Sequence, residues 1–353
     1  MKIVFLGLSI TSSWGNGHAT TYRGLVRELC RRGHDVTFLE HDKPWYADNR
    51  DLPEPPFGTT RLYASVGELQ ADHKATVENA DAVIVGSYVP EGVAVGGWAV
   101  RHATGPVCFY DIDTPVTLAK LRRGDFEYLS PELIPKYDAY LSFTGGPTLD
   151  LLERELGSPR ALPLYCNVDG EAYFPEPATG EAYDLSYLGT YSDDRQPTLD
   201  KLLLGPARAW GDGRFCVAGP LYPAGIAWPG NVGRIEHLPP AEHRGFYNAS
   251  RWTLNVTRGD MIAAGWSPSV RLFEAAACGT PVVSDRWEGL GDFFELGREI
   301  VVADTAEAAL ATIRDMPADD ARAIGAAARE TVLAKHTAAK RAEELEGYLL
   351  DLA

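Results

Sequence analysis

The chain has 353 residues, 45% of them hydrophobic and 10% aromatic, which supplies apolar material for two cores. Its formal net charge of −16 opposes nucleic acids and anionic membrane surfaces as partners. No apolar run is long enough for a signal peptide or a membrane span, so we expect a cytoplasmic protein without integral membrane contact. The 5 cysteines are scattered without a Cys-x-x-Cys pair and predict reduced thiols and no metal site.

The first half of the chain alternates short apolar runs with amphipathic stretches. Expected strands lie at 2–8, 35–40, 82–87, 106–110, 138–143 and 161–166, and expected helices at 18–33, 91–103 and 147–156. Alternation of this kind is typical of a parallel sheet covered by helices on both faces.

A second alternating series follows a stretch at 167–183 that is rich in proline and glycine and is typical of a linker. Its expected strands are 184–189, 214–218, 252–256, 281–284 and 299–302, and its expected helices are 194–204, 240–249 and 269–278. We therefore predict an α/β protein with two Rossmann-like doubly wound domains facing a central cleft. The first would span 1–170 and the second 171–335, followed by a C-terminal helix within 336–353.

The loop after the first strand contains Gly15, Asn16 and Gly17 and leads into a helix at His18. Such a turn leaves backbone N–H groups that can face an anion or a reacting group. His18 is a candidate general base or substrate contact, and the alternative is a polar residue that caps the helix.

A dinucleotide fingerprint is a competing interpretation of this loop, with Gly15 and Gly17 as its glycines and Glu40 as the acid that ends the second strand. The fit is poor, because a dinucleotide turn follows its strand almost immediately, whereas this one lies several residues beyond Leu8. The third glycine position is moreover Thr20.

Asp111 and Asp113 directly follow another predicted strand. Two carboxylates that are close in sequence form an acid–base pair only if their side chains converge in the fold. A catalytic or acceptor-binding role and simple capping of the next turn by Asp113 both remain open.

Polar loops also follow the strands of the second half, at 189–195, 219–223, 237–240 and 255–261. We expect them at one edge of one sheet, and the segment 265–284 completes the group. In this segment Arg271 and Glu274 lie three residues apart and would share one face of a helix. A cation and a carboxylate near a helix N-terminus suit a diphosphate and a ribose diol, and the alternative is a surface ion pair.

The run from Arg271 to Cys278 and Gly279 resembles the R-x-F-E-x-x-A-C-G motif of GT-B glycosyltransferases, in particular the CgeB-type enzymes that are similar to families one and four. Leu290, the pair at 293–294 and the segment 297–301 follow in the order of that family. The resemblance covers essentially the whole chain and is strongest over 184–302. The motif is fairly specific for the fold and for nucleotide-sugar binding, and weakly specific for the substrate.

The resemblance implies a hexosyltransferase-like enzyme without metal or cofactor, with a nucleotide-diphosphate sugar as donor and a small molecule or glycan as acceptor. Glu274 would bind the ribose, Arg271 and Arg195 the diphosphate, and the His237 loop would border the base. The implied donor-binding residues are Thr190, Arg195, His237, Arg258, Asp260, Trp266, Ser269, Arg271 and Glu274, and the acceptor-side loop is Gly15, Asn16 and Gly17. The C-terminal helix within 336–353 would cross back to the N-terminal domain.

One position departs from the family pattern. Many retaining relatives have a second glutamate eight positions before the ribose-binding one, and this chain has Trp266 there. The resemblance favours retention of anomeric configuration, whereas inversion would need a base, for which His18, Asp111 and Asp113 are the candidates. The alternatives are a non-catalytic nucleotide-sugar-binding or assembly protein and a sugar-nucleotide epimerase on the same fold.

Overall fold

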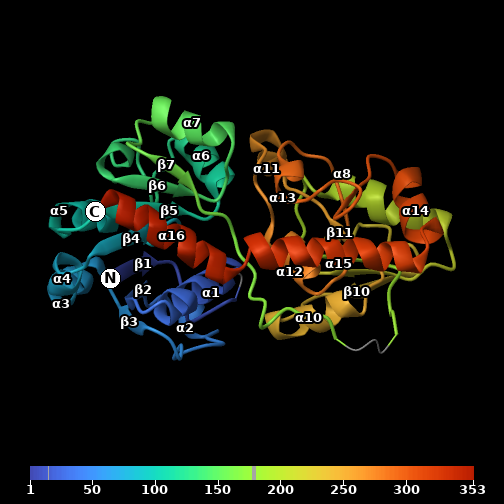
Figure 1. Cartoon of the computed structure of the whole chain (residues 1–353), viewed down its shortest axis with the longest axis horizontal. Coiled ribbons are helices and arrows are strands. Elements are labelled where there is room, and N and C mark those ends of the chain that lie inside the picture. Colours follow the sequence, from blue (N-terminus) through green and yellow to red (C-terminus); the bar gives the residue numbers. More distant parts are fainter. Residues whose placement is uncertain (15, 177–179) are drawn as a thin grey trace. The chain divides into compact units, whose positions relative to one another are not determined.

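The computed structural model describes residues 1–14, 16–176 and 180–353, and its elements are labelled in Figure 1. The chain forms two compact units. Unit 1 consists of Met1–Asn167 together with Ala338–Ala353, and unit 2 of Val168–Thr337. No helix among the described residues combines the length and the apolar character that crossing a membrane requires.

Unit 1 is built on a 7-stranded parallel sheet with the order β3-β2-β1-β4-β5-β6-β7. Its strands are β1 (Lys2–Gly7), β2 (Asp35–His41), β3 (Thr59–Tyr63), β4 (Ala82–Gly86), β5 (Val107–Asp111), β6 (Ala139–Ser142) and β7 (Ala161–Pro163). Its helices are α1 (His18–Arg31), α2 (Pro44–Ala47), α3 (Val66–Asp72), α4 (Lys74–Glu78), α5 (Gly92–His102), α6 (Thr114–Arg122), the 3-10 helix η1 (Ile134–Lys136), α7 (Pro147–Arg154) and α16 (Ala338–Leu352).

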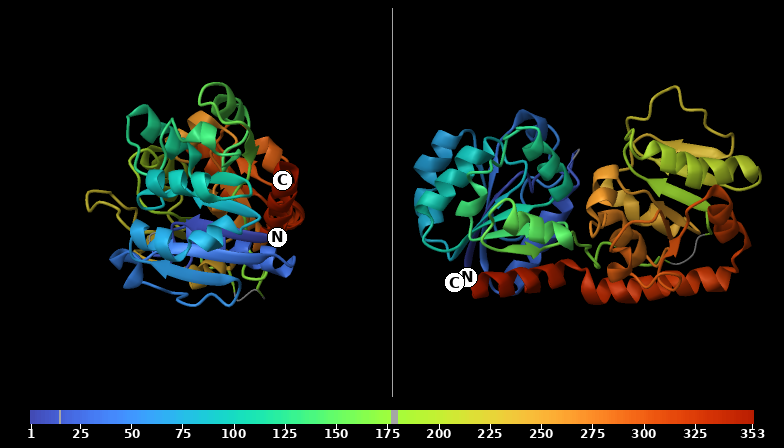
Figure 2. Two further views of the ribbon diagram at one scale, coloured as in Figure 1. Left: turned by 90° about the vertical axis from the view of Figure 1, so that its left-hand side faces the viewer. Right: turned by 90° about the horizontal axis from the view of Figure 1, so that it is seen from above.

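Neighbouring residues of the central strands point to opposite faces of this sheet and fill two cores. On one face, Val4 and Leu6 of β1 pack with buried residues of α3 and α5. On the other face, Ile3 and Phe5 pack with residues of α1 and α16. Helices α1 and α16 contact each other, which can be followed in Figure 2. The C-terminal helix is therefore part of the core of unit 1.

Unit 2 has a 6-stranded parallel sheet with the order β10-β9-β8-β11-β12-β13. Its strands are β8 (Leu185–Leu188), β9 (Phe215–Ala218), β10 (Val232–Ile235), β11 (Thr253–Asn255), β12 (Val282–Ser284) and β13 (Val301–Val302). Its helices are α8 (Gln196–Leu199), the π-helical turn η2 (Asp200–Leu204), α9 (Gly205–Ala209), α10 (Pro240–Asn248), α11 (Gly259–Ala264), α12 (Val270–Ala277), α13 (Leu290–Phe293), α14 (Ala306–Asp315) and α15 (Ala318–Lys335).

These two sheets confirm the prediction of two Rossmann-like domains. In each sheet the strand order reverses direction between two central strands, β1 and β4 in unit 1 and β8 and β11 in unit 2. Ligands of open parallel sheets bind beyond the carboxyl ends of the strands at this switch point. The loops that follow these strands are therefore the places to look for a site.

Several elements were not predicted, and each lacks the periodic apolar pattern on which the prediction rests. The edge strand β3 buries only Tyr63, and β10 contains a glycine and an arginine. Helix α11 is six residues long and begins at a glycine. The predicted strand 161–166 was too long, since only Ala161–Pro163 pairs with β6.

Candidate functional site

In unit 1, three loops at the switch point bring His18, Tyr88 and Asp113 together. His18 is the first residue of α1, and its imidazole stacks on the Tyr88 ring with the ring centroids 5.7 Å apart. The Tyr88 hydroxyl donates a hydrogen bond of 2.8 Å to Oδ2 of Asp113. Tyr88 has a φ of +63°, a left-handed conformation that is uncommon for residues other than glycine.

The surroundings set the protonation states in this cluster. Burial lowers the pKa of His18, and the nearby Asp113 opposes this shift only in part. Burial and then Asp113 raise the pKa of Tyr88, so its hydroxyl stays protonated and acts as a donor. His18 is consequently a neutral imidazole near pH 7, able both to accept and to donate a hydrogen bond.

Asp111 is the last residue of β5 and is fully buried, unlike Asp113. Its carboxylate accepts hydrogen bonds from the Tyr140 hydroxyl at 2.5 Å, the Thr117 hydroxyl at 2.8 Å and the Asp113 N–H at 3.2 Å. Burial raises the pKa of Asp111 to about 6, against the effect of these bonds. Asp111 therefore supports the turn, whereas the Asp113 side chain binds Tyr88 and makes no capping bond to α6.

The predicted acceptor-side loop is held mainly by Asn16, which is 2% exposed. Its Nδ2 donates to the carbonyl oxygens of Ser9 and Ser12, both at 3.3 Å, and its Oδ1 accepts from the His18 N–H at 3.2 Å. Gly17 is exposed at the N-cap of α1, and Gly15 lies outside the described residues. The His18 amide is thus already bonded within the loop rather than open to an anion.

In unit 2, three arginines converge at the carboxyl edge of the sheet: Arg195 before α8, Arg258 before α11 and Arg271 in α12. Arg271 in the first turn of α12 donates through Nε to the Leu188 carbonyl and through Nη1 to Asn255 Oδ1 at 3.2 Å. Arg195 precedes α8 and donates to the Thr190 carbonyl at 2.6 Å. Burial lowers the pKa of Arg195, and the positive charges of Arg271 and Arg258 lower it further.

Arg195 also has a buried Nε without a hydrogen-bond partner. A buried donor left unpaired costs roughly 1–3 kcal/mol, and an anionic ligand at this edge of the sheet would satisfy it. Gly189 lets the arginines come close to the chain, because a Cβ there would lie 2.8 Å from Arg271 Nη2 and 2.5 Å from the Tyr187 hydroxyl. The Arg271 guanidinium lies over the Tyr187 ring, 4.9 Å from its centroid.

A second layer of polar residues fixes the start of α12. Asn255 Oδ1 accepts from the Ser269 hydroxyl at 2.9 Å as well as from Arg271. The buried carboxylate of Asp285 accepts from the Thr257 N–H at 3.0 Å and hydroxyl at 2.8 Å. Burial raises the pKa of Asp285 against these bonds. Ser269 and Arg271 are thus both oriented by the last residue of β11.

Glu274 faces α10 instead of Arg271. Its side chain accepts from the Tyr247 hydroxyl at 3.2 Å, and Nδ1 of His243 lies 3.8 Å from the same oxygen. The Tyr173 hydroxyl is 3.4 Å from Nδ1 of His243. The alternative of a simple Arg271–Glu274 ion pair therefore does not describe these side chains, which bond to different elements.

Most of the other residues predicted to bind the sugar donor are exposed. His237 is exposed between β10 and α10, Thr190 is exposed, and Arg258 and Asp260 are exposed at the start of α11. Trp266 has a φ of +41°, and its indole N–H donates to Asp292 at 2.5 Å. Its backbone N–H donates to the Glu288 carbonyl at 2.7 Å, so the tryptophan is fixed in place.

Sequence reasoning missed Tyr88, Asp285 and the α10 pair His243 and Tyr247, and it named Asn255 only as the start of the polar loop 255–261. Tyr88 and Asp285 each follow a strand closely and Asn255 ends one, so their positions could have been found by inspecting every strand end. Nothing in the sequence pairs α10 with Glu274. Among residues 1–14, 16–176 and 180–353, no group of three or more His, Cys, Asp or Glu side chains is placed to hold a metal ion.

Comparison with known proteins agrees with this architecture. A family model described as "Glycosyl transferase-like" matches residues 195–347, and no curated protein matches the chain. HepE from Anabaena, solved in complex with UDP and glucose, is 13% identical, with a TM-score of 0.72 over 100% of both chains. Sucrose-phosphate synthase from Thermosynechococcus elongatus is 14% identical, with a TM-score of 0.70 over 100% of this chain and 99% of that one.

A third similar structure is an alpha-glucosyltransferase in complex with UDP and a 13-mer DNA that contains an HMU base. It is 12% identical, with a TM-score of 0.70 over 99% of both chains. At these identities the likeness establishes the fold, which is the GT-B fold of glycosyltransferases.

Proposed function

We propose that the protein is a glycosyltransferase that moves a sugar from a nucleotide-diphosphate sugar to an acceptor hydroxyl. The observation that carries this proposal is the arginine cluster of unit 2, with the buried, unpartnered Nε of Arg195 at its centre. Three cations at the carboxyl edge of a parallel sheet are suited to a diphosphate, and the matched family model covers these loops from Arg195 onward.

The donor would lie along α12. Arg195 and Arg271 would bind the diphosphate, with Arg258 adding positive charge from the start of α11 and the Ser269 end of α12 adding its dipole. Glu274 would accept hydrogen bonds from the ribose hydroxyls in place of the Tyr247 hydroxyl it binds here. The His237 loop would border the base, and the segment with Asp260 and Trp266 would line the sugar.

The arginines also account for how the leaving group departs. When the bond from the anomeric carbon to the phosphate oxygen breaks, negative charge develops on the diphosphate. Fixed guanidinium groups stabilise that charge without a metal ion, so we propose a metal-independent reaction without a cofactor. We also propose that the protein is of the CgeB type, because this resemblance rests on the motif carried by α12.

Unit 1 would bind the acceptor, a small molecule or a glycan. We propose retention, in which the acceptor proton passes to an oxygen of the leaving diphosphate while His18 and Asp113 hold the acceptor hydroxyl. An inverting reaction would instead take that proton to His18. The net charge of −16 argues against a nucleic-acid acceptor, even though one similar structure was solved with DNA.

Titration calorimetry with UDP-, GDP- and dTDP-sugars tests the donor site, and UDP-sugars come first because similar structures hold UDP. Glu274→Ala should weaken binding by about 10- to 100-fold, since a charged hydrogen bond to the diol is lost. Glu295→Ala, on the exposed surface of unit 2, is the matched control.

Product analysis with an acceptor mixture tests the transfer itself, and NMR of the product gives its anomeric configuration. Tight binding of a nucleotide sugar without hydrolysis or transfer would favour the non-catalytic alternative. Conversion of the donor into an isomeric nucleotide sugar would favour an epimerase. Unchanged affinity in Glu274→Ala would refute the donor-site assignment.

A further inference from the structure

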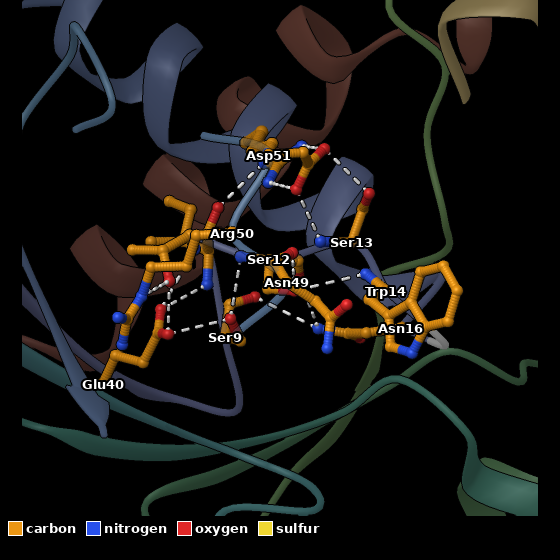
Figure 3. A network of polar contacts seen from close by, with 12 residues as sticks. Ser9, Ser12, Ser13, Trp14, Asn16, Glu40, Asn49, Arg50 and Asp51 are labelled. Atoms are coloured by element: carbon orange, nitrogen blue, oxygen red, sulfur yellow. Dashed lines mark hydrogen bonds and ion pairs between the residues drawn. The ribbon is translucent and has the colours of Figure 1, made fainter. Parts of the chain in front are cut away.

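Glu40, near the end of β2, is a fully buried carboxylate at 0% exposure. Its Oε1 accepts from the hydroxyls of Ser9 at 2.9 Å and Thr11 at 2.6 Å. Its Oε2 accepts from the N–H groups of Ile10 at 2.7 Å and Thr11 at 3.1 Å. Figure 3 shows these bonds joining the strand to the loop that leads into α1.

These four bonds leave the Glu40 carboxylate unable to bind a ligand. A carboxylate has about four acceptor sites, and here the loop fills them all. Glu40 stands where a dinucleotide-binding fold has an acid that binds a ribose, but it is closed off by residues 9–11. Its carboxylate is thus committed to the loop and has no site left for a cofactor.

The network continues from Glu40 to the first turn of α1. Ser9 Oγ, which donates to Glu40, accepts from the Ser12 N–H at 3.1 Å. The Asn16 amide then donates to the Ser9 and Ser12 carbonyls and accepts from the His18 N–H at 3.2 Å. An unbroken series of hydrogen bonds therefore links a buried carboxylate to the residue that stacks on Tyr88.

A second clamp holds the outer side of the loop (Figure 3). Asp51 accepts two bonds from the Arg23 guanidinium, at 2.8 and 2.9 Å, and two from the Ser13 N–H and hydroxyl, both at 2.8 Å. Arg23 also donates to the Ile10 carbonyl at 2.8 Å. Trp14 projects from the clamped loop with 44% of its surface exposed.

We propose that Glu40 is a positioning residue of the acceptor side. It fixes residues 9–14 and, through Asn16, the first turn of α1, so that Trp14 and His18 meet the acceptor in one arrangement. The inference rests on the proposed function. Loss of the carboxylate would leave the N–H groups of residues 10 and 11 and two hydroxyls buried without partners, so Glu40 holds the loop in place as well as filling its site. A fully satisfied polar network also specifies a single loop conformation.

Glu40→Gln tests the proposal because it keeps the shape and turns one acceptor oxygen into a donor that faces other donors. We expect kcat/KM for the acceptor to fall about 10- to 100-fold, while the nucleotide-sugar Kd of unit 2 stays within about twofold. Hydrogen exchange at the amides of residues 10–14 should rise at least about tenfold, and the NMR titration of the His18 ring should shift. Glu68→Gln is the matched control, since Glu68 accepts a hydrogen bond from the Ala64 N–H at an exposed position.

Ser9→Ala is a milder second variant, in case Glu40→Gln does not fold. It removes the hydroxyl that links Glu40 to Ser12 and should give a smaller loss in the same direction. The effects of Ser9→Ala and Asn16→Ala on loop exchange should be strongly non-additive, because both lie on one network.

Unchanged exchange and an unchanged acceptor KM in both Glu40→Gln and Ser9→Ala would overturn the proposal. Additive effects of Ser9→Ala and Asn16→Ala would also overturn it. If the wild-type protein transfers sugar to no acceptor, the proposed function fails. The exchange and imidazole measurements still decide whether Glu40 positions His18.

Discussion

The two units have the same sheet topology around their switch points but carry opposite charge there. At the edge of unit 1, Asp111 and Asp113 are bonded to tyrosine and threonine hydroxyls, and His18 is neutral. At the edge of unit 2, Arg195 and Arg271 bond to backbone and amide oxygens, and Arg195 keeps an unpaired Nε. In the described part of the chain, neither arginine is within ion-pair distance of a carboxylate.

The difference shows what topology decides and what it leaves to the side chains. Parallel strands place their following loops at one edge in both units, so convergence of polar residues is a property of the fold. The kind of ligand is a property of the charges. Arg195 and Arg271, which have no carboxylate partner among the described residues, are expected to bind an anion even in a chain of net charge −16. Neutral imidazole and phenol groups suit hydroxyls.

Removing the arginine of α12 should have the largest effect. Arg271→Gln should lower kcat/KM for transfer about 10²- to 10³-fold, because a fixed cation on the leaving diphosphate is lost. Steady-state kinetics with saturating acceptor measures the loss, and Arg286→Gln, a surface arginine paired with Asp304 at 2.9 Å, is the control. If Arg271→Gln and Arg286→Gln lowered kcat/KM equally, the arginine cluster of unit 2 would not be an anion site.

In unit 1, the buried carboxylate of Asp111 should make the stability of the fold depend on pH. The pKa of Asp111 is raised to about 6 from an ordinary value of 3.8, so the folded state binds the proton more tightly. Its contribution to stability is fully present below pH 3.8 and is lost as pH rises through about 6, an effect of about 3 kcal/mol at most.

Asp111→Asn cannot titrate and should lack this fall. Urea unfolding between pH 4 and pH 7 measures the difference in slope between the variant and the wild type. Parallel slopes for the two proteins would show that the Asp111 carboxylate is ionised at little cost in the folded state.

The particular elements that the sequence predicted share one property, which is a pattern contained within a few residues. The buried strands β1, β4 and β5 have continuous apolar runs, and their predicted ends lie within one residue of the observed ones. Helix α12 was found because its motif and the following Gly279 turn are contiguous. Strand β3 was missed because it has no apolar run of its own: it buries only Tyr63 and is held by pairing with β2.

The candidate sites follow the same rule. His18 and Arg195 could be predicted because each lies at the start of a helix that follows a strand, and Arg271 because it lies in the contiguous motif of α12. Their partners could not, since Asn255 is 16 residues from Arg271 and Tyr88 is 25 residues from Asp113. Such pairs form only when the sheet is assembled, and the direction of a side chain at a strand end depends on the packing of neighbouring loops.

His18→Gln should have a moderate effect confined to the acceptor. If His18 holds the acceptor hydroxyl, losing this contact should raise the acceptor KM about 10- to 100-fold and leave donor binding unchanged. His73→Gln, at the start of α4, is the control. A loss in kcat of about 10²- to 10⁴-fold, with an ionisation missing from the pH profile, would identify His18 as a base and the reaction as inverting.

The smallest effect is expected from Arg258, which is exposed at the start of α11 and would act on a bound donor only from a distance. Arg258→Gln should weaken nucleotide-sugar binding about two- to fivefold at low salt, as expected for a solvent-screened charge. Screening shortens from about 10 Å at 0.1 M salt to about 3 Å at 1 M, so this effect should vanish in high salt. The effect of Arg271→Gln should persist there, because its guanidinium is held against Asn255 and Tyr187, away from bulk water. Calorimetry at the two salt concentrations separates the arginines, and an Arg258 effect that survives 1 M salt would place this residue in direct contact with the diphosphate.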